Sequence, residues 1–205
     1  MASAQDRGVT EPTTFTALDS ADYRRTPWKN GGGVSIDIGG ELRAGMALAA
    51  SDATLWRFGR TTIAEPGPFS DLSGFDRVQA VVAGRGLVLE TPDGELDLRE
   101  PFRPIGFDGA TPITSRLEDG PVEVVNLIGD RRQVVIAMTV LGAGATALLQ
   151  PGIHVIYAPN DDAAVEASGV RHAVASGHAL QIDCGTELPL RGSAGTVLIG
   201  SVTKR

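Results

Sequence analysis

The fold is best predicted from the stretch Gly84-Arg85-Gly86-Leu87-Val88-Leu89, which recurs in the second half of the chain as Gly177-His178-Ala179-Leu180-Gln181-Ile182. Each stretch is followed by the pattern Glu-Leu-x-Leu, at residues 95–98 and at residues 187–190. A glycine turn that leads into an apolar strand once per half favours an internal duplication, and therefore two similar β barrels in one chain. Chance recurrence of a common turn-and-strand pattern is the alternative.

If the duplication is real, the boundary between the halves falls near Asp130-Arg131-Arg132. We then expect residues 1–12 to form a flexible N-terminal tail, residues 13–130 a first barrel and residues 131–205 a second barrel. The last apolar run, residues 197–202, either ends the second barrel or crosses over to complete the first, so strands can be shared between the barrels.

Short β-branched runs throughout the chain predict an all-β protein. The 26 glycines and 12 prolines interrupt the sequence at short intervals and leave little room for long helices. Such spacing is typical of a barrel or sandwich of many strands. The turn signal Thr91-Pro92-Asp93-Gly94 predicts a hairpin between residues 87–90 and 95–99. The predicted strands cover residues 34–38, 56–63, 78–82, 87–90, 122–128, 134–141, 154–157, 179–182 and 196–202.

Composition predicts a soluble globular protein of one domain or two closely joined ones. The 205 residues are 42% hydrophobic and 21% charged, and no apolar run is long enough to span a membrane. The N-terminus does not look like a signal peptide, and Cys184 is the only cysteine, so we expect a cytoplasmic protein. The net charge of −7 opposes direct binding to nucleic acid or to an anionic membrane.

Motifs for metal-dependent or nucleophilic catalysis are missing from the sequence. The first 153 residues contain no histidine, and His154, His172 and His178 form no H-x-H pair. Cys184 has no evident histidine partner, and Gly31-Gly32-Gly33 lacks the lysine-serine context of a phosphate loop. We therefore predict no metal, no cofactor and no catalytic residue.

The segment Thr26-Pro27-Trp28-Lys29-Asn30-Gly31-Gly32-Gly33 carries the most distinctive chemistry. An indole, an ammonium and a carboxamide lie beside three residues that permit unusual backbone geometry, so the segment can fold closely around a ligand. The alternative is an irregular turn in which Trp28 closes one end of a barrel and Lys29 lies in water.

Two further polar residues lie in apolar strands. Trp56 and Phe58 share one face of their strand, so Arg57 points into the barrel if the aromatic face packs outward, and into solvent if it does not. An inward arginine needs a partner or an anion. Asn126 lies within the apolar run 122–128, where its carboxamide needs either a structural hydrogen bond or a ligand.

Several motifs together resemble one known family. They are Pro27-Trp28-Lys29-Asn30-Gly31-Gly32-Gly33, Trp56-Arg57, Ile63-Ala64, Gly67-Pro68-Phe69-Ser70, Gly74 with Asp76-Arg77, Phe107-Asp108-Gly109, and Asp119-Gly120-Pro121-Val122 leading to Asn126. In this order they are similar to the HutD/Ves family, named for a histidine-utilisation protein and a stress-induced relative. The resemblance implies a bicupin, with two double-stranded β-helix (jelly-roll) barrels. It also implies a protein without established enzymatic activity, associated with the control of histidine breakdown.

We expect the first barrel to bind a small carboxylate metabolite such as urocanate or a formylated glutamate derivative. The expected charged contacts are Lys29, Arg57 and Arg77, and the expected orienting and apolar contacts are Trp28, Asn30, Phe69, Ser70 and Asn126, with Asp76 beside them. The protein could also be a homodimer. Two alternatives are a metal-independent isomerase or hydrolase that uses Asp76 or Asp108 as acid or base, and a stress-related interaction protein.

Overall fold

The computed structural model describes residues 12–27, 34–43 and 54–205 of the chain. These residues form nineteen strands and one short 3-10 turn, η1 (Ser20–Asp22), and they contain no α-helix. All nine strands predicted from the sequence are present. No helix in the described part of the chain is long and apolar enough to cross a membrane. The prediction of an all-β protein is therefore confirmed.

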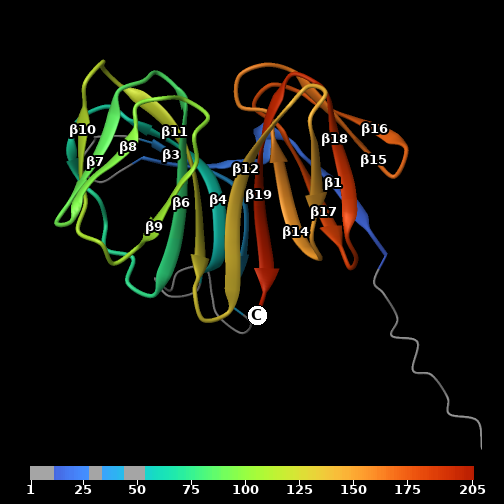
Figure 1. The fold of residues 1–205 in the computed structure, drawn as a ribbon, viewed down its shortest axis with the longest axis horizontal. Helices are drawn as coiled ribbons and strands as arrows, with labels where there is room; N and C mark the ends of the chain where they lie inside the picture. The colour runs from blue at the N-terminus through green and yellow to red at the C-terminus, as the bar shows by residue number, and fades with distance from the viewer. Residues whose placement is uncertain (1–11, 28–33, 44–53) are drawn as a thin grey trace, which may run out of the picture.

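The first half of the chain builds two sheets that face each other (Figure 1). The larger sheet has the order β2 (Arg24–Pro27), β3 (Val34–Leu42), β4 (Thr54–Ile63), β11 (Val122–Asp130), β6 (Phe75–Ala83) and β9 (Ile105–Asp108). The smaller sheet has the order β5 (Gly67–Pro68), β10 (Thr114–Leu117), β7 (Leu87–Thr91) and β8 (Gly94–Leu98). The predicted hairpin of β7 and β8 is confirmed.

The second half builds a second pair of sheets. Its larger sheet has the order β1 (Thr14–Leu18), β17 (Ala179–Cys184), β14 (Gly152–Tyr157), β19 (Thr196–Lys204) and β12 (Val134–Gly142). Its smaller sheet has the order β13 (Thr146–Leu149), β18 (Leu188–Ala194), β15 (Ala163–Ala167) and β16 (Val170–Val174). The last strand, β19, stays in the second half and pairs with β12 and β14.

The two halves repeat the same order of eight strands. The order β4-β11-β6-β9 matches β12-β19-β14-β17, and β5-β10-β7-β8 matches β13-β18-β15-β16. The two similar stretches that suggested this repeat, residues 84–89 and 177–182, are not equivalent in it. They lead into β7, in a smaller sheet, and β17, in a larger one, whereas the structural counterpart of β7 is β15. The repeat is real, but the similarity of the two stretches is a coincidence of two glycine turns.

One strand crosses from the beginning of the chain into the second half. β1 pairs with β17, from Thr14 opposite Asp183 to Leu18 opposite Ala179, although the expected first unit of residues 13–130 contained it. Phe15 on β1 stacks on His172 of β16, with ring centroids 4.4 Å apart. The crossing strand therefore helps to cover the second pair of sheets and ties the two halves together.

Three apolar clusters explain the arrangement. One fills the space between the sheets of the first half, another fills the second half, and the third joins the two larger sheets back to back. In this third cluster Phe58 lies against Gly200, where an added Cβ would approach the phenyl ring to 2.5 Å. The inner face of the first larger sheet is thus turned toward its own smaller sheet, and this face carries the candidate site.

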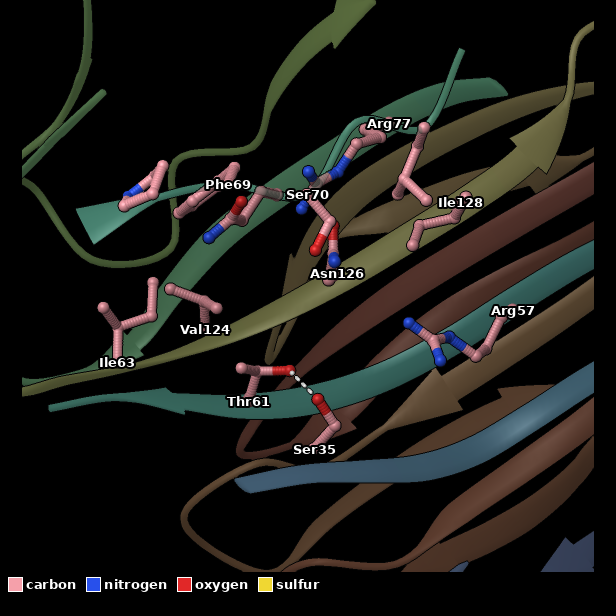
Figure 2. A pocket seen from close by; sticks show the side chains of 13 residues that line it. Ser35, Arg57, Thr61, Ile63, Phe69, Ser70, Arg77, Val124, Asn126 and Ile128 are labelled. Carbon is pink, nitrogen blue, oxygen red and sulfur yellow. Dashed lines mark hydrogen bonds between the residues drawn. The ribbon is translucent and has the colours of Figure 1, made fainter. Parts of the chain in front are cut away.

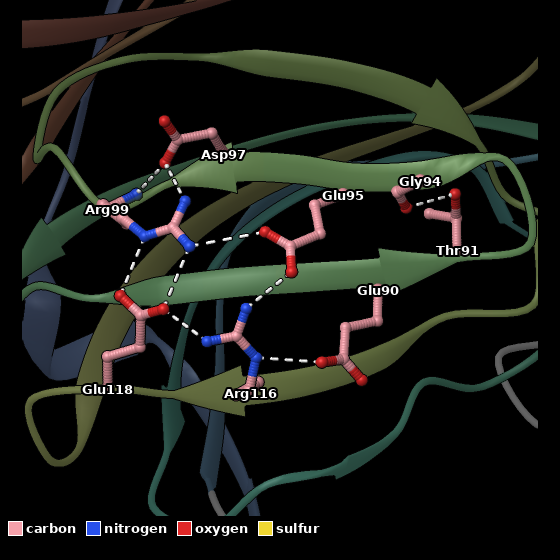
Figure 3. Close-up of polar contacts among 8 residues, drawn as sticks. All are labelled: Glu90, Thr91, Gly94, Glu95, Asp97, Arg99, Arg116 and Glu118. Carbon is pink, nitrogen blue, oxygen red and sulfur yellow. Dashed lines mark hydrogen bonds and ion pairs between the residues drawn. The ribbon is translucent and has the colours of Figure 1, made fainter.

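The outer face of the first smaller sheet carries a network of ion pairs (Figure 3). Arg99 and Arg116 both contact Glu118 and Glu95. The two arginines hold the pKa of the Glu118 carboxyl well below its usual range, at about 2. This face is exposed, and each exposed ion pair contributes little stability. The network therefore makes the outer face of the sheet hydrophilic and does not contribute to the candidate site.

Candidate functional site

A cavity of about 470 Å³ lies between the two sheets of the first half. Its floor is the inner face of β4, β11 and β6, where alternate residues of each strand point inward. The register sets three rows across the floor: Arg57, Ile128 and Arg77 form the first, Gly59, Asn126 and Gln79 the second, and Thr61, Val124 and Val81 the third. Figure 2 shows the labelled side chains of this floor converging on one space.

Arg77 is the most unusual side chain of the cavity, because it is a buried cation that lacks a carboxylate partner within the described part of the chain. It is only 7% exposed, and its Nε has no hydrogen-bond partner there. Its guanidinium lies 4.9 Å from the ring centre of Phe69 and 5.0 Å from that of Phe107. Burial, and to a lesser extent the charge of Arg57, lowers the pKa of Arg77 to about 10.

Arg57 differs from Arg77 in exposure and in its partner. Its side chain is 43% exposed at the rim of the cavity, and its Nη1 lies 3.6 Å from Asp37 Oδ1. The neighbouring aromatics Trp56 and Phe58 are buried in the cluster between the halves. Of the two orientations that the sequence left open for Arg57, the structure has the one toward the cavity, because the aromatic face of β4 packs against the second half.

Two carboxamides lie side by side in the second row of the floor. Asn126 pairs with Gln79 across β11 and β6, and Gln79 is 1% exposed. Asn126 Oδ1 and Gln79 Oε1 are buried and have no hydrogen-bond partner among residues 12–27, 34–43 and 54–205. A buried polar atom without a partner costs free energy, and a bound ligand can supply the missing hydrogen bond.

The roof of the cavity is held in place by a buried serine. Ser115 on β10 accepts a hydrogen bond from Gly67 N at 3.1 Å and donates one to Gly67 O at 3.0 Å. The next residues, Pro68, Phe69 and Ser70, follow from this anchor and line the cavity. At the opposite side, the hydroxyls of Ser35 and Thr61 lie 3.3 Å apart (Figure 2).

The structure brings together five of the nine residues predicted for the ligand site. Asp76 does not line the cavity: its carboxylate lies 3.0 Å from Arg131. The segment with Trp28, Lys29 and Asn30 lies outside the described residues. The five predicted residues that line the cavity are Arg57, Phe69, Ser70, Arg77 and Asn126.

Gln79 was missed by the sequence analysis. Two features of the sequence could have found it: Gln79 is an amide within the apolar run 78–82, as Asn126 is within 122–128, and its place two residues after Arg77 puts it on the same face.

The two aspartates considered as acid or base lie away from the cavity. Arg131 contacts both Asp76 and Asp108, and its hydrogen bond to Asp108 lowers the pKa of that carboxyl. Asp108 is therefore ionised at neutral pH and paired. Neither aspartate lines the cavity, so the geometry gives them no acid–base role there.

Two of the three histidines have local hydrogen-bond partners. His154 is buried, with Nδ1 2.9 Å from Ser201 Oγ and Nε2 2.8 Å from Gln150 O. His178 lies 3.2 Å from the hydroxyl of Ser20. Within the described ranges no group of three or more His, Cys, Asp or Glu side chains is placed to hold a metal ion.

The cavity is suited to a small anion with an apolar body. Two guanidinium groups provide charged donors, two carboxamides provide neutral hydrogen bonds, and Phe69, Ile128 and Val124 provide apolar walls. The facing sheets with their repeated order of strands, together with this interior cavity, define a cupin-like β protein.

The chain belongs to the HutD family, whose model matches residues 20–199. It is 32% identical over 111 residues to an uncharacterised 21.2 kDa protein in the hutC 3′ region of Pseudomonas putida, an alignment that spans 54% of this chain and only 56% of that protein.

Two solved structures are similar over nearly the whole chain. HutD from Pseudomonas fluorescens SBW25 has a TM-score of 0.77 and 26% identity, covering 94% of this chain and 100% of the other. A conserved protein of unknown function from Pseudomonas aeruginosa PAO1 has a TM-score of 0.76 and 22% identity, covering 93% and 98%, and supports the fold alone.

Proposed function

We propose that the chain is a non-enzymatic regulatory protein whose first half senses a small carboxylate metabolite of histidine catabolism. The observation that carries the proposal is Arg77, a buried guanidinium with no carboxylate partner in the described ranges. Burial of an unpaired charge is costly. A ligand carboxylate held between Arg57 and Arg77 would offset that cost, and family membership supports the choice of pathway.

Urocanate and a formylated glutamate derivative are the two candidate ligands. Each combines a carboxylate with a second polar group that Gln79 and Asn126 can meet by hydrogen bonds. We infer that the halves are two jelly-roll barrels, a bicupin, since each repeats the same order of eight strands in two four-stranded layers.

Regulation by such a protein would be indirect. The net charge of −7 disfavours contact with DNA, so the chain would act through a protein partner or by sequestering an inducer. We further propose that it works in the cytoplasm without a cofactor, nucleic-acid contact or membrane association, as a monomer or a homodimer.

Isothermal titration calorimetry with urocanate and N-formylglutamate tests the proposal. We expect one of the two acids to bind, whereas its fully esterified form (methyl urocanate, or the dimethyl ester of N-formylglutamate), which keeps the body but loses the carboxylate charge, binds far more weakly. NMR of the mixture should show the acid unchanged after prolonged incubation. Absence of binding by both acids up to millimolar concentration would refute the carboxylate sensor, and turnover would refute the non-enzymatic role.

A further inference from the structure

Asp37 is the carboxylate that the structure places against Arg57, one of the two cavity arginines. Among the described residues it contacts Arg57 and no acidic side chain contacts Arg77. Asp37 is shared unequally: its Oδ1 lies 3.6 Å from Arg57 Nη1, whereas its Oδ2 accepts hydrogen bonds from Arg24 Nε at 3.0 Å and from Arg24 Nη2 at 2.6 Å. Asp37 is therefore bound more closely by Arg24, which donates two hydrogen bonds to it, than by Arg57.

The strand register explains this sharing. Asp37 on β3 lies directly opposite Arg24 on β2 and directly opposite Gly59 on β4. Gly59 has no side chain, and an added Cβ would come within 2.6 Å of Ile36 O, so the two strands approach closely here. Arg57, two residues before Gly59 on the same face, can therefore reach Asp37 diagonally. Side chains of alternating charge run along this edge: Arg24, Asp37 and Arg57.

We propose that Asp37 is a built-in counter-ion that competes with the ligand carboxylate for Arg57, and that Arg24 weakens this competition by holding Asp37 away. This inference rests on the proposed function, because it concerns the affinity of the same cavity. Without ligand, Asp37 partly neutralises Arg57, the more exposed of the two arginines. A bound carboxylate takes over Arg57 while it also reaches Arg77, which Asp37 does not contact.

The consequence is a site whose affinity is lower than two free arginines would provide. A carboxylate next to Arg57 repels an approaching anion and partly neutralises the guanidinium that would attract it. Loss of Asp37 should therefore tighten binding, and loss of Arg24 should weaken it, since Asp37 is then free to pair fully with Arg57. An improvement in affinity is an effect that damage to the fold does not produce.

The test is a double-mutant cycle measured by calorimetry with urocanate and with N-formylglutamate as probes. We expect Asp37→Asn to bind the active probe about threefold more tightly than the unchanged protein, and Arg24→Gln to bind it about threefold more weakly, as for partly exposed ion pairs. The double variant should match Asp37→Asn, because Arg24 acts through Asp37. Asp183→Asn, an exposed site in the second half, is the control for net charge.

Three results would overturn the inference. The first is that Asp37→Asn binds the probe no more tightly than the unchanged protein, although its melting temperature is unchanged. The second is that the loss of affinity in Arg24→Gln persists in the double variant. If Asp37→Asn fails to fold, Arg24→Gln alone decides, and unchanged affinity in that variant is the third. Absence of binding by the unchanged protein and by all variants overturns the proposed function itself, and this inference with it.

Discussion

Arg57 and Arg77 lie on opposite sides of the same residue, Ile128. Ile128 on β11 pairs with Arg57 on β4 and with Arg77 on β6, and all three side chains line one cavity. Two guanidinium groups thus flank an apolar floor, and only Arg57 has a carboxylate partner in the described part of the chain.

Arg77→Met should weaken ligand binding while it makes the fold more stable. Loss of a charge-assisted contact is expected to weaken urocanate or N-formylglutamate binding about tenfold or more. Replacement of an unpaired buried charge by an apolar side chain of similar length should raise the free energy of unfolding by about 1 kcal/mol. Calorimetry and urea denaturation measure the two effects.

Arg85→Met is the matched control for that variant, because Arg85 is exposed and pairs with Asp119 on the surface. It should change neither binding nor stability appreciably. Destabilisation by Arg77→Met would mean that the contacts of Arg77 with Phe69 and Phe107 outweigh its unpaired charge.

Asn126→Asp should imitate a bound ligand. Asn126 lies diagonally next to both arginines, one row from Ile128, so a carboxylate there can reach either guanidinium. We expect a higher melting temperature and a loss of affinity of about tenfold or more for the carboxylate probes.

Asn126→Leu removes the amide without adding charge and serves as the comparison. It should weaken binding less than Asn126→Asp does. Equal affinities of the two variants would contradict an anion site beside Asn126.

His154 should make stability depend on pH near neutrality. Burial lowers the pKa of His154 from its ordinary value of 6.5, so the unfolded chain binds a proton that the folded protein does not. The part of the free energy of unfolding that depends on a neutral His154 is fully present above pH 6.5. It is lost as the pH falls from 6.5 toward the lowered pKa. The slope contributed by one such group is at most about 1.4 kcal/mol per pH unit.

Urea denaturation of the unchanged protein and of His154→Gln, from about pH 7.5 to about pH 5.5, isolates this contribution. The variant is expected to show a shallower decline of stability over that range. Identical slopes in the two proteins would show that His154 does not titrate differently in the folded and unfolded states.

Arg60 should couple the two halves. It lies on the outer face of β4, pairs with Glu123, and donates from Nη1 to Tyr157 OH at 3.2 Å and to Pro159 O at 2.5 Å. Arg60→Met leaves these acceptors without their donor, and we expect a loss of about 2 kcal/mol in the free energy of unfolding. Tyr157→Phe removes a single hydrogen bond and should cost about 1 kcal/mol. A loss in Arg60→Met no larger than in Arg85→Met would contradict this role.

The strands were predictable because their signal is local. Glycine and proline mark the breaks, β-branched residues fill the runs between them, and all nine predicted strands are present. The duplication was inferred from a wrong correspondence, since β7 and β17 occupy different layers. Similar turns produce similar short sequences, whereas strand equivalence depends on pairing partners that lie far apart in the chain.

The candidate site was predictable only in part. Arg57, Arg77 and Asn126 stood out because a charged or amide side chain in an apolar strand needs a partner. Asp76, next to Arg77, points to the other face and pairs with Arg131, because neighbouring residues of a strand alternate in direction. Gln79, in the predicted strand 78–82, and Asp37, in the predicted strand 34–38, carry the same signal but were not predicted.

The sequence by itself determined the all-β class, the positions of the main strands and the types of side chain available to the cavity, because these follow from local backbone preference and from the alternation of residues along a strand. Only the tertiary structure decided that β1 joins the second half, that Arg57 and Arg77 meet across Ile128, and that Asp37 is divided between Arg24 and Arg57. These relationships depend on strand register, which is set by packing between distant segments and is not encoded in any short stretch of the chain.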